Sequence, residues 1–91
     1  MALVVVAYDI SHDRRRAKMH RLLLGFGKPV QESVFECDLD EPGLRELRAR
    51  LRRLVRLGDS VRLYPLCADC ATRIDDGLGR RPAPAPDVYV T

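Results

Sequence analysis

The sequence predicts an α+β protein of the ferredoxin-like type, with the order βαββαβ, an antiparallel sheet and both helices on one face. Three observations predict this fold. An almost continuous apolar run occupies residues 3–9, two later segments carry apolar residues at helical spacing, and strand-like segments follow each of them. The 91 residues suit one domain. We expect the ferredoxin-like domain over residues 1–76, followed by a Gly/Pro linker and a C-terminal strand over residues 77–91.

The first strand and helix are defined by their apolar residues. Residues 3–9 are rich in valine, which is typical of a central strand covered on both faces. Ser11 is a candidate N-cap of the following helix, and the acidic Asp13 suits its positive end. The apolar stripe of this helix has i, i+3, i+4, i+7 spacing and consists of Met19, Leu22, Leu23 and Phe26. The residues that end it are Gly25, Gly27 and Pro29.

The central part of the sequence predicts strand structure over residues 30–39. A polar interruption, Gln31-Glu32-Ser33, indicates either a bulge or a division into two short strands. Asp40 can then cap a second helix, whose first turn contains Pro42, where the missing N–H costs nothing. The buried seam of that helix is predicted to be Leu44, Leu47, Leu51 and Leu54.

The C-terminal third begins with a turn at Gly58-Asp59 and a strand over Ser60–Leu66, where apolar and polar residues alternate. A further short strand is expected at Thr72–Asp75. The segment from residue 77 to 86 holds two glycines and three prolines, so it is neither helix nor central strand. Residues 87–91 regain β character, and a strand after such a linker needs a sheet edge. We expect a partner subunit to supply that edge, and the open face of the sheet to be the dimer interface.

Composition sets limits on function. The net charge of +3 and the pI of about 9.0 permit a polyanionic partner without requiring one. No apolar run reaches the roughly 18 residues of a membrane span, and no basic region precedes the first apolar segment as in a secretory signal. Three cysteines do not make a disulfide scaffold. We therefore expect a cytoplasmic protein without a membrane partner.

The main clue to function is Asp9, which stands at the exit of the first strand just before the cluster Arg14, Arg15, Arg16 and Lys18. A carboxylate can hold a hard divalent cation such as Mg²⁺ or Mn²⁺, and the basic residues can hold backbone phosphates of RNA or DNA. One carboxylate binds Mg²⁺ weakly, but two copies of Asp9 can share an ion across a two-fold axis. The alternative interpretation is an Asp that caps the following turn.

The basic residues also have two interpretations, phosphate binding or a solvated helix face. We expect Arg16 and Lys18 to lie near the site, with Arg14 and Arg15 pointing outward or onto nucleic acid. The second helix carries six arginines, at positions 45, 48, 50, 52, 53 and 56, and these admit the same two interpretations.

Five other side chains are candidates for the site. Ser33 can donate a hydrogen bond to a phosphate or water, or satisfy backbone at a bulge. Phe35 can stack on a base, or lie in the core or the dimer interface. Tyr8 faces away from Asp9 and suits packing or a phosphate contact from the side. The two histidines, His12 and His20, are candidate general bases or ordinary surface residues.

Cys67 and Cys70 form a C-x-x-C pair. A tetrahedral zinc site needs four ligands, and no second Cys/His pair has suitable spacing. Redox chemistry has no support from the sequence, so these cysteines are interpreted as structural.

Three motifs, in order, resemble the CRISPR-associated Cas-two (Cas2) family. They are Tyr8-Asp9-Ile10-Ser11-x-Asp13-x-Arg15-Arg16-x-Lys18, Gly27-Lys28-x-Val30-Gln31-x-Ser33-Val34-Phe35-Glu36 and Asp59-Ser60-Val61-Arg62-x-Tyr64-Pro65-Leu66-Cys67. The resemblance covers nearly the whole chain. It implies a ferredoxin-like homodimer that exchanges its C-terminal strand, with Mg²⁺- or Mn²⁺-dependent endonuclease activity on RNA or DNA. It also implies a partner, the Cas-one (Cas1) integrase, in the acquisition of new spacers for antiviral defence.

The resemblance assigns roles to particular residues. Asp9 matches the metal-site aspartate of the family, and the residues that match positions around this site are Tyr8, Arg16, Lys18, Ser33 and Phe35. His12 departs from the family pattern, in which an acidic or small polar residue is usual. Two other functions fit the same sequence: a non-catalytic DNA-binding scaffold of the integrase complex, and a metal-free ferredoxin-like RNA-binding module.

Overall fold

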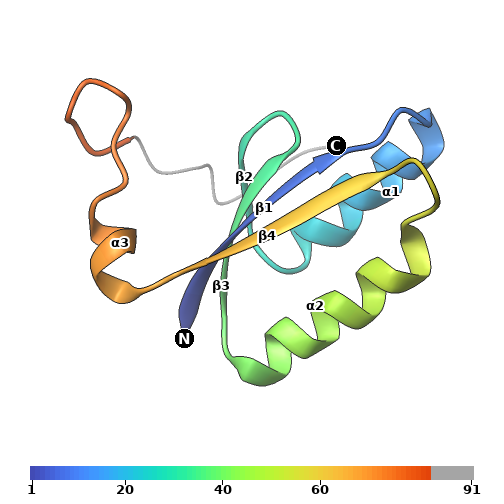
Figure 1. The fold of residues 1–91 in the computed structure, drawn as a ribbon, viewed down its shortest axis with the longest axis horizontal. Coiled ribbons are helices and arrows are strands. Elements are labelled where there is room, and N and C mark those ends of the chain that lie inside the picture. Colours follow the sequence, from blue (N-terminus) through green and yellow to red (C-terminus); the bar gives the residue numbers. More distant parts are fainter. Residues whose placement is uncertain (83–91) are drawn as a thin grey trace.

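A four-stranded antiparallel sheet with the strand order β2-β3-β1-β4 organises the chain (Figure 1). The computed structural model describes residues 1–82. In chain order the elements are β1 (Ala2–Asp9), α1 (Asp13–Leu24), β2 (Lys28–Gln31), β3 (Val34–Leu39), α2 (Glu41–Leu54), β4 (Ser60–Leu66) and α3 (Ala68–Thr72). This order and pairing confirm the predicted ferredoxin-like class. The strand predicted at 87–91, and its exchange with a partner, lie outside the described residues.

The core lies between the sheet and the helices α1 and α2, which cover the same face (Figure 1). Alternate residues of β1, Val4, Val6 and Tyr8, are buried on that face. The helices contribute Met19 and Leu23 from α1, and Leu47 and Leu51 from α2. Burying a side chain of this size contributes about 1.5–3 kcal/mol.

The helices α1 and α2 leave the other face of the sheet uncovered, and the short α3 contacts β1 and β4 at the end where Leu3 pairs with Leu66. Leu3, Val5 and Ala7 of β1 are only half-buried there, although the sequence predicts a strand covered on both faces. The apolar run therefore reflects one face packed against the helices and a second apolar face that a single chain leaves open. This open face runs to Asp9 at the end of the strand.

Helix α1 begins one residue later than predicted, because its N-cap is His12 and not Ser11. The imidazole Nδ1 of His12 accepts a hydrogen bond from the backbone N–H of Arg15 at 3.2 Å, which is the role usually taken by an Asn or Asp side chain. By contrast, the predicted start of α2 is confirmed. The Asp40 carboxylate accepts from the N–H of Gly43 at 2.8 Å, with Pro42 in the first turn.

The polar interruption in the predicted 30–39 strand divides it into β2 and β3, with a register shift between Pro29 and Gln31. Ser33 turns the chain with a φ of +68°, an unusual value for a residue with a side chain. Its carbonyl accepts from the Tyr8 N–H at 3.1 Å, so the turn is fastened to the end of β1. The sequence left open whether the interruption is a bulge or a division into two strands, and the structure has two strands.

The strand predicted at Thr72–Asp75 is wrong, because the short helix α3 and a turn occupy this region. Local bonds favour the helix. The Thr72 hydroxyl donates to the carbonyl of Asp69 at 2.7 Å, and Arg73 pairs with the Asp69 carboxylate one turn back at 3.0 Å. The first residues of the predicted linker form a small loop, which Asp76 and Arg80 close through a salt bridge and a backbone hydrogen bond.

Candidate functional site

Asp9 is the last residue of β1 and is exposed on the open face of the sheet, in line with Leu3, Val5 and Ala7. Its register partner in β4 is Ser60. The strand alternation therefore places a carboxylate at the end of an apolar column that a second molecule can cover.

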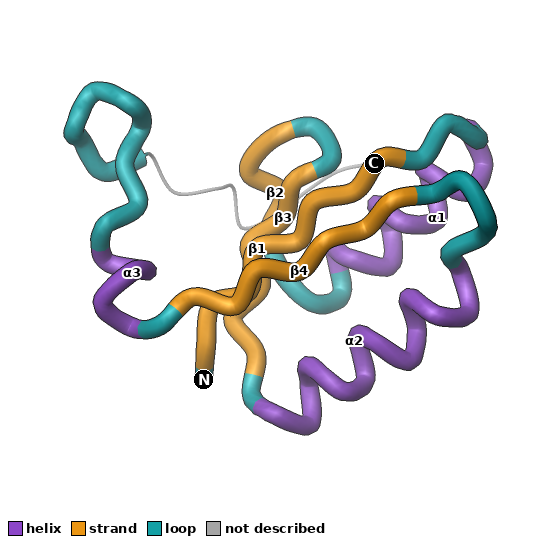
Figure 2. Tube along the Cα trace, viewed as in Figure 1, coloured by secondary structure: helices purple, strands orange, loops and turns teal. Residues whose placement is uncertain are grey.

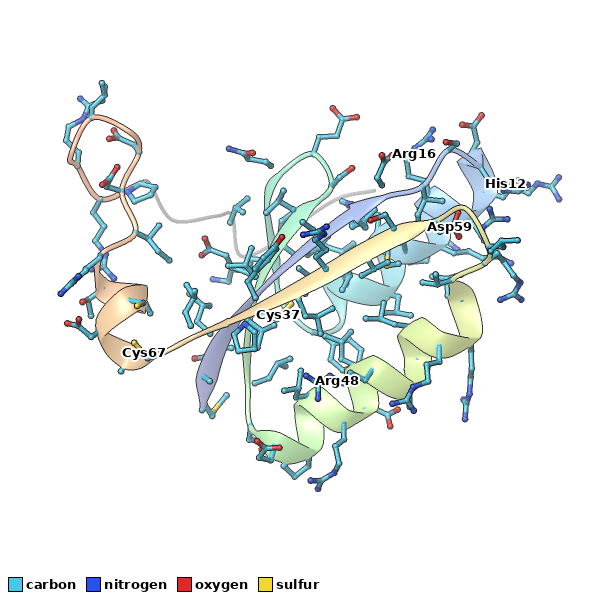
Figure 3. The ribbon with its side chains drawn as sticks, in the orientation of Figure 1. His12, Arg16, Cys37, Arg48, Asp59 and Cys67 are labelled. Atoms are coloured by element: carbon cyan, nitrogen blue, oxygen red, sulfur yellow. The ribbon has the colours of Figure 1, made fainter. Side chains whose placement is uncertain are left out.

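Arg16 lies beside this strand exit. Its guanidinium donates to the carbonyls of Ile10 and Ser11 at 3.1 and 3.3 Å, and to the carboxylate of Asp13 at 2.6 Å. These bonds hold the cation over the loop that leaves Asp9 (Figure 3). The structure places Arg16 beside the strand exit, and the expected role of Arg16 and Lys18 in the site stays a prediction.

A cleft of about 490 Å³ lies on the helix side of the sheet, and its walls include Tyr8, Arg16, His20 and Ser33. Burial raises the pKa of the Tyr8 phenol, while a hydrogen bond with the Ser33 side chain and the charge of Arg16 act in the opposite direction. Three of the predicted site residues, Tyr8, Arg16 and Ser33, therefore lie together in this cleft. Asp9 is absent from the walls of the cleft because it projects to the opposite face.

His20 also lines this cleft. The sequence suggested a general base or an ordinary surface residue, but the structure shows that His20 is half-buried. Its ring packs edge-on against Phe35 with a centroid distance of 5.2 Å. The spacing of the two residues could have predicted this position, because His20 follows Arg16 by one helical turn and so shares its side of α1. Other cleft residues that the sequence analysis did not single out are Arg21, Gln31 and Glu32.

Phe35 is fully buried, and its ring lies 6.4 Å from that of Tyr8. Of its alternative interpretations, the core position is the one that the structure adopts. A ring in this position cannot stack on a base, so its contribution is to support Tyr8 and His20.

The remaining cations of α1 divide differently from the prediction. Arg15 does not point outward: its guanidinium makes two hydrogen bonds, of 2.8 and 3.0 Å, to the carboxylate of Asp59 before β4. Arg14 and Lys18 are exposed, and within residues 1–82 neither has an acidic partner. Together with Arg21, which is also exposed and lines the cleft, these two are the cations of α1 that remain available to a ligand.

The arginines of α2 also divide into paired and unpaired groups. Arg50 pairs with Glu46 at 2.9 Å, and Arg56 donates to the carbonyls of residues 53–55 at the end of the helix. Four others are exposed and have no acidic partner in the described part of the chain: Arg45, Arg48, Arg52 and Arg53. Figure 3 shows Arg48 on this helix, well apart from Arg16 and Asp59.

A metal site was expected at Asp9. Among residues 1–82, no group of three or more His, Cys, Asp or Glu side chains is placed to hold a metal ion. A single carboxylate supplies one or two of the six oxygens around Mg²⁺. One chain therefore fits Mg²⁺ or Mn²⁺ only as a contributor to a shared site, in which a second molecule, phosphates or water supply the other oxygens.

The fold and the site define a small ferredoxin-like domain with a carboxylate at one strand end and exposed cations on two helices. Residues 1–74 match the family model for CRISPR associated protein Cas2. A Chloroflexus aurantiacus protein named CRISPR-associated endoribonuclease Cas2 1 is 47% identical over 89 residues, covering 94% of this chain and 96% of its own. A Thermus thermophilus protein named CRISPR-associated endonuclease Cas2 2 is 55% identical over 65 residues, covering 70% and 72%. The chain belongs to the Cas2 family.

Solved structures agree with this assignment. Streptococcus pyogenes Cas2 matches with a TM-score of 0.72 and 28% identity, covering 80% of this chain and 95% of its own. A chain of a partial Cas6-RT-Cas1–Cas2 complex matches with a TM-score of 0.78 and 30% identity, covering 92% and 99%. Within residues 1–82, no helix has the length and apolar character that crossing a membrane requires.

Proposed function

We propose that this protein is a Mg²⁺- or Mn²⁺-dependent endonuclease that hydrolyses phosphodiester bonds of RNA or DNA as a homodimer. The observation that carries the proposal is the position of Asp9, exposed at the end of the central strand on the open face of the sheet. The names of the relatives, endoribonuclease and endonuclease Cas2, support the reaction class.

The open face explains why the active form would be a dimer. Leu3, Val5 and Ala7 form a half-buried apolar column that ends at Asp9. A second copy packed face to face across a two-fold axis would cover this column and bring two Asp9 carboxylates toward each other. A shared divalent ion offsets their repulsion and, when bound, supplies Lewis-acid charge and an activated water. The strand expected at residues 87–91 would pair with the sheet of the partner.

The chain's own cations would hold the substrate. Arg16 is fixed beside the strand exit by the carbonyls of Ile10 and Ser11, so its remaining charge can orient a phosphate near Asp9. Arg14 and Lys18 extend this positive surface along α1. Tyr8 and Ser33 would contact the backbone from the cleft on the other side of the sheet.

The protein would act with Cas1 in the acquisition of new spacers for antiviral defence, in the cytoplasm. The support is the similarity to a chain of a solved Cas6-RT-Cas1–Cas2 complex, which covers 92% of this protein.

The test is a cleavage assay with purified protein on single-stranded RNA, single-stranded DNA and duplex DNA, with Mg²⁺, Mn²⁺ or EDTA. We expect metal-dependent cleavage that Asp9→Asn abolishes while the Tm and the dimer remain, because Asp9 is exposed and makes no core contact. The control is Glu41→Gln, which removes an exposed carboxylate in the first turn of α2, at the opposite end of β1 from Asp9, and should leave cleavage within a few-fold. Cleavage by Asp9→Asn at the parent rate would contradict the proposal.

A second function is favoured by one observation: in residues 1–82, Asp9 belongs to no group of three or more His, Cys, Asp or Glu side chains that could hold a metal ion. In that case the protein is a DNA-binding scaffold for Cas1 without hydrolytic activity. The parent protein would then bind duplex DNA and Cas1 but cut none of the three substrates with either metal.

A further inference from the structure

The three cysteines occupy two different environments. Cys37 is fully buried in β3, and burial raises the pKa of its thiol to about 11. Cys67 and Cys70 are both exposed and free, at the point where β4 ends and α3 begins. Figure 3 shows Cys67 at the end of the sheet opposite His12, Arg16 and Asp59. The C-x-x-C pair is thus accessible and separate from the candidate nuclease site.

The two exposed thiols are held together by one helical turn. The backbone N–H of Cys70 donates to the Cys67 sulfur at 3.3 Å, and the N–H of Ala71 donates to the Cys67 carbonyl at 2.9 Å. Side chains three residues apart in a helix have Cβ atoms about 5–6 Å apart, and a disulfide needs about 3.5–4.5 Å. Cys67 is the cap residue with an extended backbone, and its sulfur already lies 3.3 Å from the Cys70 nitrogen, so the two thiols belong to the same turn.

The same contacts make the two sulfurs chemically unequal. Hydrogen bonds from the Cys70 N–H and the Cys70 thiol to the Cys67 sulfur lower the pKa of Cys67. The bond to Cys67 and its developing negative charge raise the pKa of Cys70. An exposed thiol that ionises readily beside one that keeps its proton is the arrangement of an attacking and a resolving cysteine.

Metal binding is less consistent with this geometry. Within residues 1–82 no third Cys, His, Asp or Glu joins the pair to make a metal-binding group. Two thiolates alone leave half of a tetrahedral zinc site unfilled.

We propose that Cys67 and Cys70 form a redox-active dithiol that exchanges with a low-molecular-weight disulfide of the glutathione class. The Cys67 thiolate attacks one sulfur of that disulfide, a mixed disulfide forms and one small thiolate leaves. The Cys70 thiol then loses its proton, its sulfur attacks the Cys67 sulfur, and the second small thiolate leaves. Two protein thiols are oxidised to one internal disulfide, and the small disulfide is reduced to two thiols.

The disulfide would change a defined part of the surface. Cys67, Ala68 and Ala71 line a groove together with Leu3 and Phe26. A bond between Cys67 and Cys70 would fix the first turn of α3 and so the shape of this groove. The inference concerns these thiols alone and does not depend on the proposed nuclease activity.

The test is incubation of the reduced full-length protein with oxidised glutathione, followed by intact mass measurement and peptide mapping. We expect a mass loss of two hydrogens, with Cys67 and Cys70 in one cross-linked peptide. In a separate alkylation assay of the native reduced protein, Cys67 should react more than about a hundredfold faster than Cys37, which serves as the internal control.

Two variants separate the roles. Cys70→Ser should stop at a glutathione adduct on Cys67, because the resolving thiol is missing. Cys67→Ser should react much more slowly. Both residues are exposed, so an unchanged Tm serves as the folding control. Stable glutathione adducts on both cysteines of the parent protein, disulfides only between chains, or retained Zn²⁺ that blocks oxidation would each overturn the proposal.

Discussion

Arg15 and Asp59 form an ion pair through two parallel hydrogen bonds, of 2.8 and 3.0 Å, although 44 positions separate them in the sequence. The Asp59 carboxylate also accepts from the N–H of Arg56 at 2.9 Å, and its side chain is only 3% exposed. The pair connects the first turn of α1 to the turn before β4, two segments that lie side by side in Figure 2. It therefore braces the end of the sheet from which Asp9 projects.

This pair predicts a pH-dependent stability. The Arg15 guanidinium and the Arg56 N–H hold the pKa of the Asp59 carboxyl below its ordinary value. A lowered folded-state pKa adds stability above the unfolded pKa of about 4, and this stability is lost as the pH falls through the folded pKa. We expect Asp59→Asn to lower the Tm by several degrees at pH 7, with a difference from the parent that shrinks below about pH 4.

The matched control for that experiment is Glu46→Gln, which breaks the exposed Arg50–Glu46 pair. Exposed pairs contribute little, so its Tm should stay close to that of the parent across the same pH series, measured by circular dichroism. A Tm difference for Asp59→Asn that widened on acidification would contradict the assignment.

The loop between α1 and β2 allows a second prediction, at Gly27. A Cβ atom built on Gly27 would meet the Glu36 carbonyl oxygen and would lie 2.6 Å from the Cys37 sulfur. Because the obstacle is partly backbone of β3, the neighbour cannot simply rotate away. Gly27→Ala should destabilise the protein by about 1–3 kcal/mol, measured by urea unfolding. Gly25→Ala, whose Cβ would come no closer than 3.3 Å to the Leu22 oxygen, should cost clearly less.

These contacts show which features the sequence alone could predict. The start of α2 was predictable because the Asp40 cap and Pro42 act on their own first turn. The strand pattern was likewise local and gave β1, β3 and β4. The Arg15–Asp59 pair joins distant segments, so no local pattern reveals it. The helix α3 was missed because the bonds that form it depend on side chains of weak helix propensity, such as Thr72.

Some features of the candidate site could likewise be predicted from the sequence, and others could not. The position of Asp9 on the open face follows from strand alternation, and so does the opposite orientation of Tyr8. What the sequence could not give is the meeting of Tyr8 with Ser33, because this depends on the register of the β2–β3 hairpin and on the positive φ of Ser33.

Ser33 provides a third prediction, which separates a structural from a functional role. Its φ of +68° is unfavourable for a side chain and especially for a β-branched one. Ser33→Val should therefore destabilise the protein by about 1–2 kcal/mol. Ser33→Gly removes the backbone strain at this positive φ but raises the conformational entropy of the unfolded chain. Its net effect on the free energy of unfolding should therefore stay within about 1 kcal/mol.

The glycine variant then tests the hydroxyl with the fold retained. If Ser33 contacts a phosphate or water during catalysis, Ser33→Gly should cut the cleavage rate about tenfold or more at nearly unchanged stability. Unchanged cleavage by a variant with the parent Tm would assign Ser33 to the turn alone.

The unpaired arginines of α2 give the last prediction. Arg48 and Arg52 are exposed, lack acidic partners in residues 1–82 and lie about 6 Å apart along the helix, so both can reach phosphates of one duplex. Each phosphate contact with duplex DNA contributes about 0.9 to the slope of log K against log salt. The double variant Arg48→Gln/Arg52→Gln should therefore reduce this slope by about 1.8, measured by fluorescence anisotropy in EDTA to prevent cleavage. Arg50→Gln is the matched control, because Glu46 already occupies that guanidinium. Equal slopes for the parent and the double variant would mean that α2 is a solvated face and that the duplex lies on α1.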